Sequence, residues 1–286
     1  MRKLTTGVAI AAVLIVGLSI AFAKGVFTQP ETAANAGNSV SHAADVRVAS
    51  RNATPESRGV GLLAMKTAGA ANKYLFAFFW KDDDTATMAM KRVFESATQK
   101  VSERADAVAV QISDPAESGI VEKFGLDRAP MPLVLAIAPN GAVTGGFPSE
   151  FTEQDLLDAF ASPSTEQSMK ALQDGKLVFL CVQNDTTKLN AEALQGVREF
   201  KADERFAAAS EIVMLDPTDS AESSFLNDLK IDPKTPLAVT AFLVPPGSVI
   251  AEFEGATNKE QLLAALQSAG SCGPGGVCGP GGCGPR

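Results

Sequence analysis

The sequence is poor in the residues that most often carry chemistry, with one histidine, one tryptophan, one tyrosine and four cysteines among 286 residues. The lone histidine, His42, argues against histidine-rich metal sites and against catalysis by a histidine acid or base. Basic residues are also in the minority, and the formal net charge is -8. That balance disfavours nucleic acid or an anionic membrane as a partner held by a basic face. We therefore expect no nucleic-acid partner.

The N-terminus has the pattern of an export signal. The residues Met1-Arg2-Lys3 form a positive start, an apolar run follows over residues 7–23, and Ala21-Phe22-Ala23 fits a small-x-small cleavage site. Residues 1–23 are thus predicted to be a secretory signal peptide. The alternative is an uncleaved membrane anchor, since about 17 apolar residues are at the lower limit for spanning a bilayer. In both cases the protein is exported, periplasmic or extracytoplasmic, and its cysteines face an oxidising compartment.

The rest of the chain divides into two similar halves between low-complexity ends. Residues 24–71 indicate a flexible linker, 72–161 a first domain, 162–174 a second linker, 175–268 a second domain, and 269–286 a flexible Cys/Gly/Pro tail. Each domain is predicted to have the order β-α-β-α-β-β-α, because buried apolar runs alternate with helix-periodic segments. The two prolines Pro132 and Pro236 align the halves at an offset of 104 residues. An internal repeat of this length indicates a duplicated unit.

This element order resembles the thioredoxin-like fold, which implies an α/β class with two tandem thioredoxin-like domains, each a mixed sheet flanked by helices. Members of that family place a proline, usually cis, before the third core strand. Met131-Pro132 in "RAPMPLVLAIAPNG" and Thr235-Pro236 in "DPKTPLAVTAFLVPPG" match that position. The resemblance therefore implies cis prolines at Pro132 and Pro236, because a cis X-Pro bond costs only about 0.5–1 kcal/mol relative to trans.

The chain departs from the family at the redox centre. Catalytic thioredoxins carry Trp-Cys-Gly-Pro-Cys after the first buried strand, whereas this sequence has Asp84-Thr85-Ala86-Thr87 after "KYLFAFFW" and Asp185-Thr186-Thr187 after "GKLVFLCVQ". Aspartate and threonine are helix-capping residues without redox chemistry. The domains thus resemble scaffolds without the usual catalytic site, and we expect no catalytic residue within them.

Three of the four cysteines lie in the tail "SCGPGGVCGPGGCGPR", as Cys272, Cys278 and Cys283. Three readings remain open. The thiolates could bind a soft metal, Cu(I) or Zn(II). They could exchange disulfides, with Cys272 and Cys278 closing a short loop and Cys283 left for a partner thiol. The tail could also be an inert low-complexity end.

The remaining candidates favour structural roles. Cys181 lies mid-strand in "VFLCVQ" and is expected to be a buried, inert thiol, with a partnership to a tail thiol as the alternative. Asp82, Asp83 and Asp84 are expected to cap a helix rather than bind a cation, and Trp80 is expected to pack rather than contact a substrate.

Taken together, the sequence predicts an exported, non-catalytic scaffold or adaptor whose tail binds a soft metal or the thiols of an envelope or secreted partner. The alternative is an extracytoplasmic thiol-disulfide oxidoreductase that uses Cys272, Cys278 and Cys283 as a shuttle. Membrane contact is expected only through the N-terminal segment if it stays uncleaved.

Overall fold

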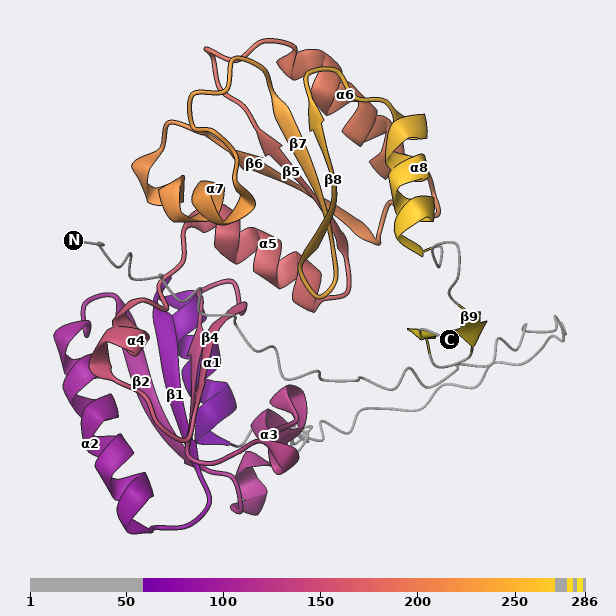
Figure 1. Ribbon diagram of the computed structural model, residues 1–286. Helices are drawn as coiled ribbons and strands as arrows, with labels where there is room; N and C mark the ends of the chain where they lie inside the picture. The colour runs from indigo at the N-terminus through magenta and orange to yellow at the C-terminus, as the bar shows by residue number, and fades with distance from the viewer. Residues whose placement is uncertain (1–58, 271–276, 280–281, 285–286) are drawn as a thin grey trace, which may run out of the picture.

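The computed structural model describes residues 59–270, 277–279 and 282–284, and it contains two units of the same architecture. Each unit is a four-stranded mixed sheet with helices on both faces, and the two units follow one another along the chain (Figure 1). The thioredoxin-like α/β class predicted from the sequence is therefore confirmed, with the element order repeated.

The first unit contains eight main elements. They are α1 (Val60–Ala70), β1 (Tyr74–Trp80), α2 (Thr85–Lys100), β2 (Ala105–Gln111), α3 (Ser118–Phe124), β3 (Leu133–Ile137), β4 (Val143–Pro148) and α4 (Glu153–Leu157). Short 3-10 turns at Pro115–Glu117 and Leu126–Arg128 flank α3.

The second unit repeats this order. Its elements are α5 (Pro163–Gln173), β5 (Leu177–Val182), α6 (Asn190–Lys201), β6 (Ser210–Leu215), α7 (Ser223–Leu229), β7 (Val239–Val244), β8 (Ser248–Glu254) and α8 (Lys259–Gly270). A 3-10 turn at Ser220–Glu222 precedes α7, and the tail adds two short strands, β9 (Val277–Gly279) and β10 (Gly282–Gly284).

Strand order and register agree between the two sheets. The orders are β2-β1-β3-β4 and β6-β5-β7-β8, with the first pair of strands parallel and the other pairs antiparallel. Even the irregularities correspond, because β3 shifts register at Ala136/Ile137 and β7 at Phe242/Leu243, which are 106 positions apart. The two units therefore share strand order, pairing direction and the position of the register shift.

Each sheet separates two hydrophobic layers, because successive side chains of a strand point to opposite faces. On β1, Phe76 and Phe78 pack towards α2 and α4, while Leu75, Ala77 and Phe79 pack towards α1 and α3. The central strand β5 has the same alternation, with Val178, Leu180 and Val182 facing α5 and α7 and with Phe179 facing α6 and α8. Burial on both faces explains why both strands are continuous apolar runs in the sequence.

Two helices of the structure lie in stretches that the sequence assigned to linkers. Helix α1 lies inside the expected linker 24–71 and packs on β1 and β2, and α5 occupies most of the expected linker 162–174 and packs on β5 and β6. Both are the first helix of their unit. The sequence did not assign them to the domains because the strands and the glutamates that they contact lie far along the chain, and a local apolar pattern does not show such contacts.

A cis peptide bond was expected before Pro132 and before Pro236, and the structure has it only before Pro132. The Met131–Pro132 peptide bond is cis, whereas the bond before Pro236 is not, and the second cis bond in the described residues is Pro245–Pro246. The backbone explains the difference. The amide of Ser149 donates to the carbonyl of Pro132, and the equivalent amide of Gly255 donates to the carbonyl of Ala238. Ala238 therefore occupies the position of Pro132, and the true offset there is 106 residues rather than 104.

Several predictions fall on residues outside the described ranges, namely the signal peptide or anchor at 1–23, most of the linker 24–71, and Cys272. Among the helices that the structure describes, none combines the length and apolar character needed to cross a membrane.

Candidate functional site

The carboxyl end of β1 is where the resemblance places a redox centre, and the structure places a helix cap there. Asp84 is the N-cap of α2, and its Oδ1 accepts a hydrogen bond of 2.7 Å from the amide of Thr87. This hydrogen bond is the main cause that lowers the pKa of Asp84. A carboxylate thus satisfies the free amides of the first turn, which in catalytic relatives would face a cysteine thiolate.

The corresponding end of β5 is also a polar turn without a thiol. The Asn184 Oδ1 accepts from the amide of Thr186 at 2.9 Å, and the Asn184 Nδ2 donates to the Asp216 Oδ1 at 2.9 Å. Thr187 and Asn190 complete the turn through their side chains. The side chains of Asn184, Thr187 and Asn190 thus form the hydrogen bonds of the turn, and none of them is a nucleophile beside a base.

Cys181 is the one cysteine within residues 59–270, and it is chemically shielded. It is 2% exposed, faces α6 and α8 beside Phe179 and Phe200, and burial raises its pKa to about 12. The prediction of a buried cysteine is confirmed. Because the thiolate is the reactive form, this residue is inert at neutral pH.

The other strand-end candidates have structural roles or remain exposed. Trp80 is partly buried against the layer that contains Phe78 and Phe94, and Asp82 and Asp83 are exposed. Within the described ranges, no group of three or more histidine, cysteine or acidic side chains is placed to hold a metal ion.

The structure contains two buried glutamates that the sequence did not predict. Glu117 and Glu222 are each 4% exposed, and each binds the first turn of the first helix in its own unit. The Glu117 carboxylate accepts from the amides of Val60 at 2.7 Å and Gly61 at 3.0 Å. It therefore caps α1 from a distant segment, where an anion is stabilised by free amides and the helix dipole.

Glu222 does the same for α5 with a different set of donors. Its carboxylate accepts from the amide of Ser164 at 3.1 Å and from the hydroxyls of Ser162 and Ser164. A sequence signal existed, because Asp-x-Ala-Glu-Ser occurs at 114–118 and again at 219–223. Recognising it required the knowledge that a helix precedes each unit's first strand.

A polar contact links the two units through α5. The Tyr74 hydroxyl donates to the Glu166 Oε1 at 2.6 Å and accepts from the amide of Ala161 at 2.9 Å. Burial is the main cause that raises the pKa of Tyr74 and of Glu166. In addition, the Gln173 side-chain amide donates to the Val143 carbonyl at 2.7 Å and accepts from the Val143 amide at 2.9 Å. Helix α5 therefore packs on its own sheet and also binds β4 of the first unit (Figure 1).

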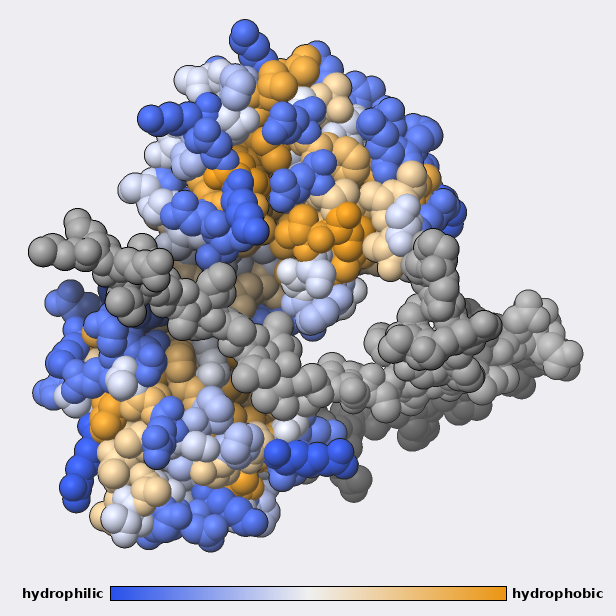
Figure 2. All heavy atoms as spheres, in the orientation of Figure 1, coloured by the Kyte–Doolittle hydropathy of each residue, from blue (hydrophilic) through white to orange (hydrophobic). Residues whose placement is uncertain are grey.

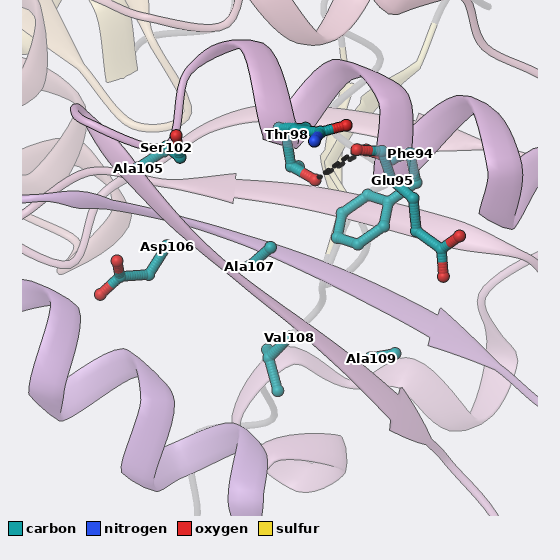
Figure 3. A pocket seen from close by; sticks show the side chains of 10 residues that line it. Phe94, Glu95, Thr98, Ser102, Ala105, Asp106, Ala107, Val108 and Ala109 are labelled. Atoms are coloured by element: carbon teal, nitrogen blue, oxygen red, sulfur yellow. Dashed lines mark hydrogen bonds between the residues drawn. The ribbon is translucent and has the colours of Figure 1, made fainter.

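The surface offers a shallow hollow between α2 and the outer edge of β2 (Figure 3). Its volume is about 470 Å³, and its lining includes Phe94, Glu95, Thr98 and Asp106. The Thr98 hydroxyl donates to the carbonyl of Phe94 in its own helix, and Asp106 pairs with Lys73 at 3.3 Å. Two polar groups of the lining, those of Thr98 and Asp106, are therefore already engaged within the protein.

Large exposed apolar side chains are spread over several elements of both units, with two of them on α1. They are Val60, Leu63, Met88, Leu189, Met214 and Val249. On the face seen in Figure 2, hydrophobic areas alternate with hydrophilic ones. Single exposed apolar residues are normal on a soluble surface and define no interface by themselves.

Two of the three candidate cysteines of the tail occupy paired positions on two short strands. Strands β9 and β10 pair antiparallel, with Cys278 opposite Cys283 and with Gly279 opposite Gly282. Cys272, the third candidate, lies outside the described residues.

The topology defines the class of protein, two tandem thioredoxin-like domains. Comparison with known protein families gives no match, and no curated protein matches this chain. Solved structures of similar fold include the first two thioredoxin domains of Saccharomyces cerevisiae Eps1p, with 11% identity, 71% of this chain and 94% of that chain covered, and a TM-score of 0.27.

Two further similar structures come from a bacterium and from human. A disulphide isomerase from Xylella fastidiosa Temecula1 is 13% identical, with 34% of this chain and 83% of that chain covered and a TM-score of 0.28. Human ERp44 is 10% identical, with 72% of this chain and 55% of that chain covered and a TM-score of 0.32. At these identities the likeness concerns the fold alone.

Proposed function

We propose that this protein is an exported, non-catalytic scaffold whose two thioredoxin-like units present a thiol-bearing tail to partner proteins or to a soft metal. The observation that supports the proposal most is the pair of strand ends after β1 and β5. There Asp84 caps a helix and Asn184 organises a turn, at the positions where a catalytic relative would carry cysteine. Cys181, the one cysteine of the described folded units, is buried.

In this proposal the thiol chemistry belongs to Cys272, Cys278 and Cys283. Thiolates on a glycine-rich chain can bind Cu(I) or Zn(II), and they can also form mixed disulfides with a partner's cysteine. Export to an oxidising compartment would favour the disulfide form. Both roles use the tail as the contact and the folded units as its carrier.

The test compares the full chain with a chain that ends at Gly270. Both are purified without reductant, exposed to Cu(I), to Zn(II) and to glutathione disulfide, and analysed for bound metal and for glutathione adducts. The full chain is expected to take up about one equivalent of metal or to form adducts, and the shortened chain neither. Equal behaviour of the two chains would contradict the proposal, and a Cys181→Ser variant, expected to behave like the parent, serves as the matched control.

A second candidate function is a thiol-disulfide oxidoreductase that works through the tail. It is favoured by the register that sets Cys278 opposite Cys283, because a dithiol that closes and opens is what such a reaction needs. Repeated turnover of insulin disulfides at the expense of glutathione, absent from the chain that ends at Gly270, would support catalysis. Stoichiometric adducts without turnover would support the scaffold.

A further inference from the structure

Strand β2 forms an open edge of the first sheet. It stands at the end of the strand order β2-β1-β3-β4, and within the described residues no other strand pairs with its outer side. The carbonyl of Arg104 and the amide of Ile112 bond to β1 at the two ends of β2. Since backbone groups alternate sides along a strand, the amides and carbonyls of Ala107 and Ala109 point away from β1. An open edge of this kind is a template for another extended chain.

A hollow lies on each side of this edge. The hollow between α2 and β2 has Ala107 and Ala109 in its lining and a volume of about 470 Å³ (Figure 3). A second hollow of about 370 Å³ lies between α1 and β2, where Val60 and Leu63 are 55% and 61% exposed. Val108 of β2 belongs to the lining of both hollows. A strand added at the edge would therefore send alternate side chains into one hollow and the other.

The second unit has larger side chains at the equivalent place. Counted from the first residue pair of each ladder, Ala107 and Ala109 of β2 correspond to Ile212 and Met214 of β6. Ile212 packs against the layer that contains α6 and α8. The alanines of the first unit therefore leave open a space that larger side chains take in the second. Bulky apolar side chains of a partner would restore the missing contacts.

The charge and the shape of the edge favour a basic peptide over a second copy of this chain. Glu95 lines the hollow from α2, is exposed, and forms no ion pair within the described residues. The formal net charge of -8 attracts cationic segments and repels acidic ones. Two β2 strands paired antiparallel about Val108 would set Ala107 opposite Ala109, so that a second copy would leave the hollow empty.

We propose that the edge of β2 binds an extended segment of a partner protein as an added strand. The segment carries bulky apolar side chains at alternate positions, which enter the hollow beside Ala107 and Ala109, and a lysine or arginine that meets Glu95. Hydrogen bonds to the outward backbone groups of β2 provide affinity, and the hollows select the side chains. This inference goes beyond the proposed function, because it needs no cysteine and lies entirely in the first unit.

The test selects binding sequences from a library of random seven-residue peptides, the length of β2, on the immobilised full chain. Enriched peptides are expected to carry bulky apolar residues at alternate positions and to contain lysine or arginine. Their affinities are then measured by fluorescence polarisation for the parent chain and for the Ala107→Ile/Ala109→Met variant. A library that yields no such enriched peptide contradicts the proposal.

The double variant gives the first unit the side chains that β6 carries, so the fold should be kept while the hollow is filled. Peptide affinity is expected to fall at least about tenfold, because the apolar side chains of the peptide lose their place. Met214→Ala, at an exposed residue of β6, is the matched control and should bind the peptide as the parent does. Equal affinity of the double variant and the parent would overturn the assignment.

Ala109→Pro provides a second variant in case the double variant does not fold. Proline removes one outward amide donor and leaves the bonds to β1, an arrangement that edge strands tolerate. Binding is expected to weaken at least about fivefold. N-methylation of the peptide amides that face β2 should abolish binding, whereas N-methylation of the alternate amides should not. Equal effects of the two methylation patterns would show that no strand is added and would overturn the proposal.

Hydrogen exchange distinguishes a partner peptide from other occupants of the edge. The amides of Ala107 and Ala109 should exchange rapidly in the free chain and slowly in the peptide complex. Protection of both amides in a peptide-free monomer would assign the edge to another segment of this chain. A dimer that the parent forms and the double variant does not form would assign it to a second copy. Either result would overturn the proposal.

The outcome can be separated from that of the proposed function. The chain that ends at Gly270 keeps β2 and lacks the tail cysteines, so it should bind the peptide as the full chain does. Peptide binding by both chains without any capture of metal or thiols would refute the role of the tail and keep the edge site. Capture by the tail without peptide binding would refute the edge site and keep the role of the tail.

Discussion

At the scale of single residues, burial decides which thiols can react. Cys181 lies opposite Thr240 in the sheet and packs among the phenylalanines of β5, α6 and β7. A polar or charged form is costly in such surroundings, so the thiol stays protonated. This is the physical reason why a cysteine in the middle of a buried apolar run is a packing residue.

Selective alkylation should separate Cys181 from the tail. With its pKa raised to about 12, roughly one Cys181 in 10⁴ is a thiolate near pH 8, and this fraction rises only as the pH approaches 12. A maleimide added to the reduced native chain should modify Cys272, Cys278 and Cys283 and leave Cys181 intact until the protein is denatured. Peptide mass spectrometry reads the sites, and modification of native Cys181 at the rate of the tail thiols would contradict this prediction.

Position 196 in α6 requires glycine because a larger side chain would collide with the backbone that leads into α8. A Cβ added to Gly196 would overlap the carbonyl oxygen of Thr257, in the backbone that leads into α8. Helix propensity favours alanine over glycine by about 1 kcal/mol, but a backbone overlap in a packed core costs typically 1–3 kcal/mol.

We therefore expect Gly196→Ala to lower the free energy of unfolding, against the direction of helix propensity. Chemical denaturation followed by circular dichroism measures the change. Gln195→Ala, at the exposed neighbouring position, is the control and should change stability by less than about 0.5 kcal/mol. A stabilised Gly196→Ala variant would show that the α6–α8 contact can yield.

At the scale of elements, each unit is closed by one buried carboxylate that caps its first helix. Gly59 and Gly61 leave room for it, since a Cβ at Gly59 would lie 2.7 Å from the Glu117 Oε2. The contact joins segments more than 50 residues apart and fixes α1 against the turn before α3. Charge-assisted hydrogen bonds of this kind are among the stronger ones in proteins.

Replacing the carboxylate by an amide tests this cap. Glu117→Gln keeps the size but turns one acceptor into a donor that faces backbone amides, so the free energy of unfolding should fall by about 1–3 kcal/mol. Glu122→Gln, on the exposed side of α3, is the control and should be nearly neutral. Equal stability of the two variants would show that water replaces the cap without cost.

The sequence predicted the strands directly, but it did not show that the first helix of each unit belongs to the folded domain. Strands β1 and β5 are buried on both faces, and their apolar runs therefore show them directly. Helices α1 and α5 are held by long-range contacts of Glu117 and Glu222, which no local pattern contains. Likewise, the alignment of Pro236 with Pro132 was plausible in sequence, but backbone hydrogen bonding places Ala238 there.

At the scale of the whole molecule, α5 connects the units through Tyr74 and Glu166. Burial raises the pKa of Glu166 above its ordinary value of 4.5, with the Tyr74 hydrogen bond acting in the opposite direction. The folded state therefore holds this proton more tightly than the unfolded state does. Glu166 makes its full contribution to the free energy of unfolding at a pH below its pKa in the unfolded chain. This contribution is lost as the pH rises through the higher pKa of Glu166 in the folded protein.

Glu166→Gln should make the stability less dependent on pH. The amide oxygen still accepts from Tyr74, but there is no carboxyl group left to ionise. Between about pH 4 and about pH 7, the decline in melting temperature should be smaller for Glu166→Gln than for the parent chain. Glu103→Gln, at an exposed position, is the matched control and should keep the parent profile; an unchanged profile for Glu166→Gln would contradict the assignment.

The same helix has a practical consequence for anyone who divides this gene. The amide of Ala161 donates to Tyr74 of the first unit, while Ser162, one residue later, donates to Glu222 of the second. A boundary placed before Ala161 removes partners of Tyr74 and Val143, and a boundary placed after Gln173 strips β5 and β6 of the helix that covers them. No fusion or expression boundary in this stretch is neutral, so the tandem pair is best handled as a single genetic module.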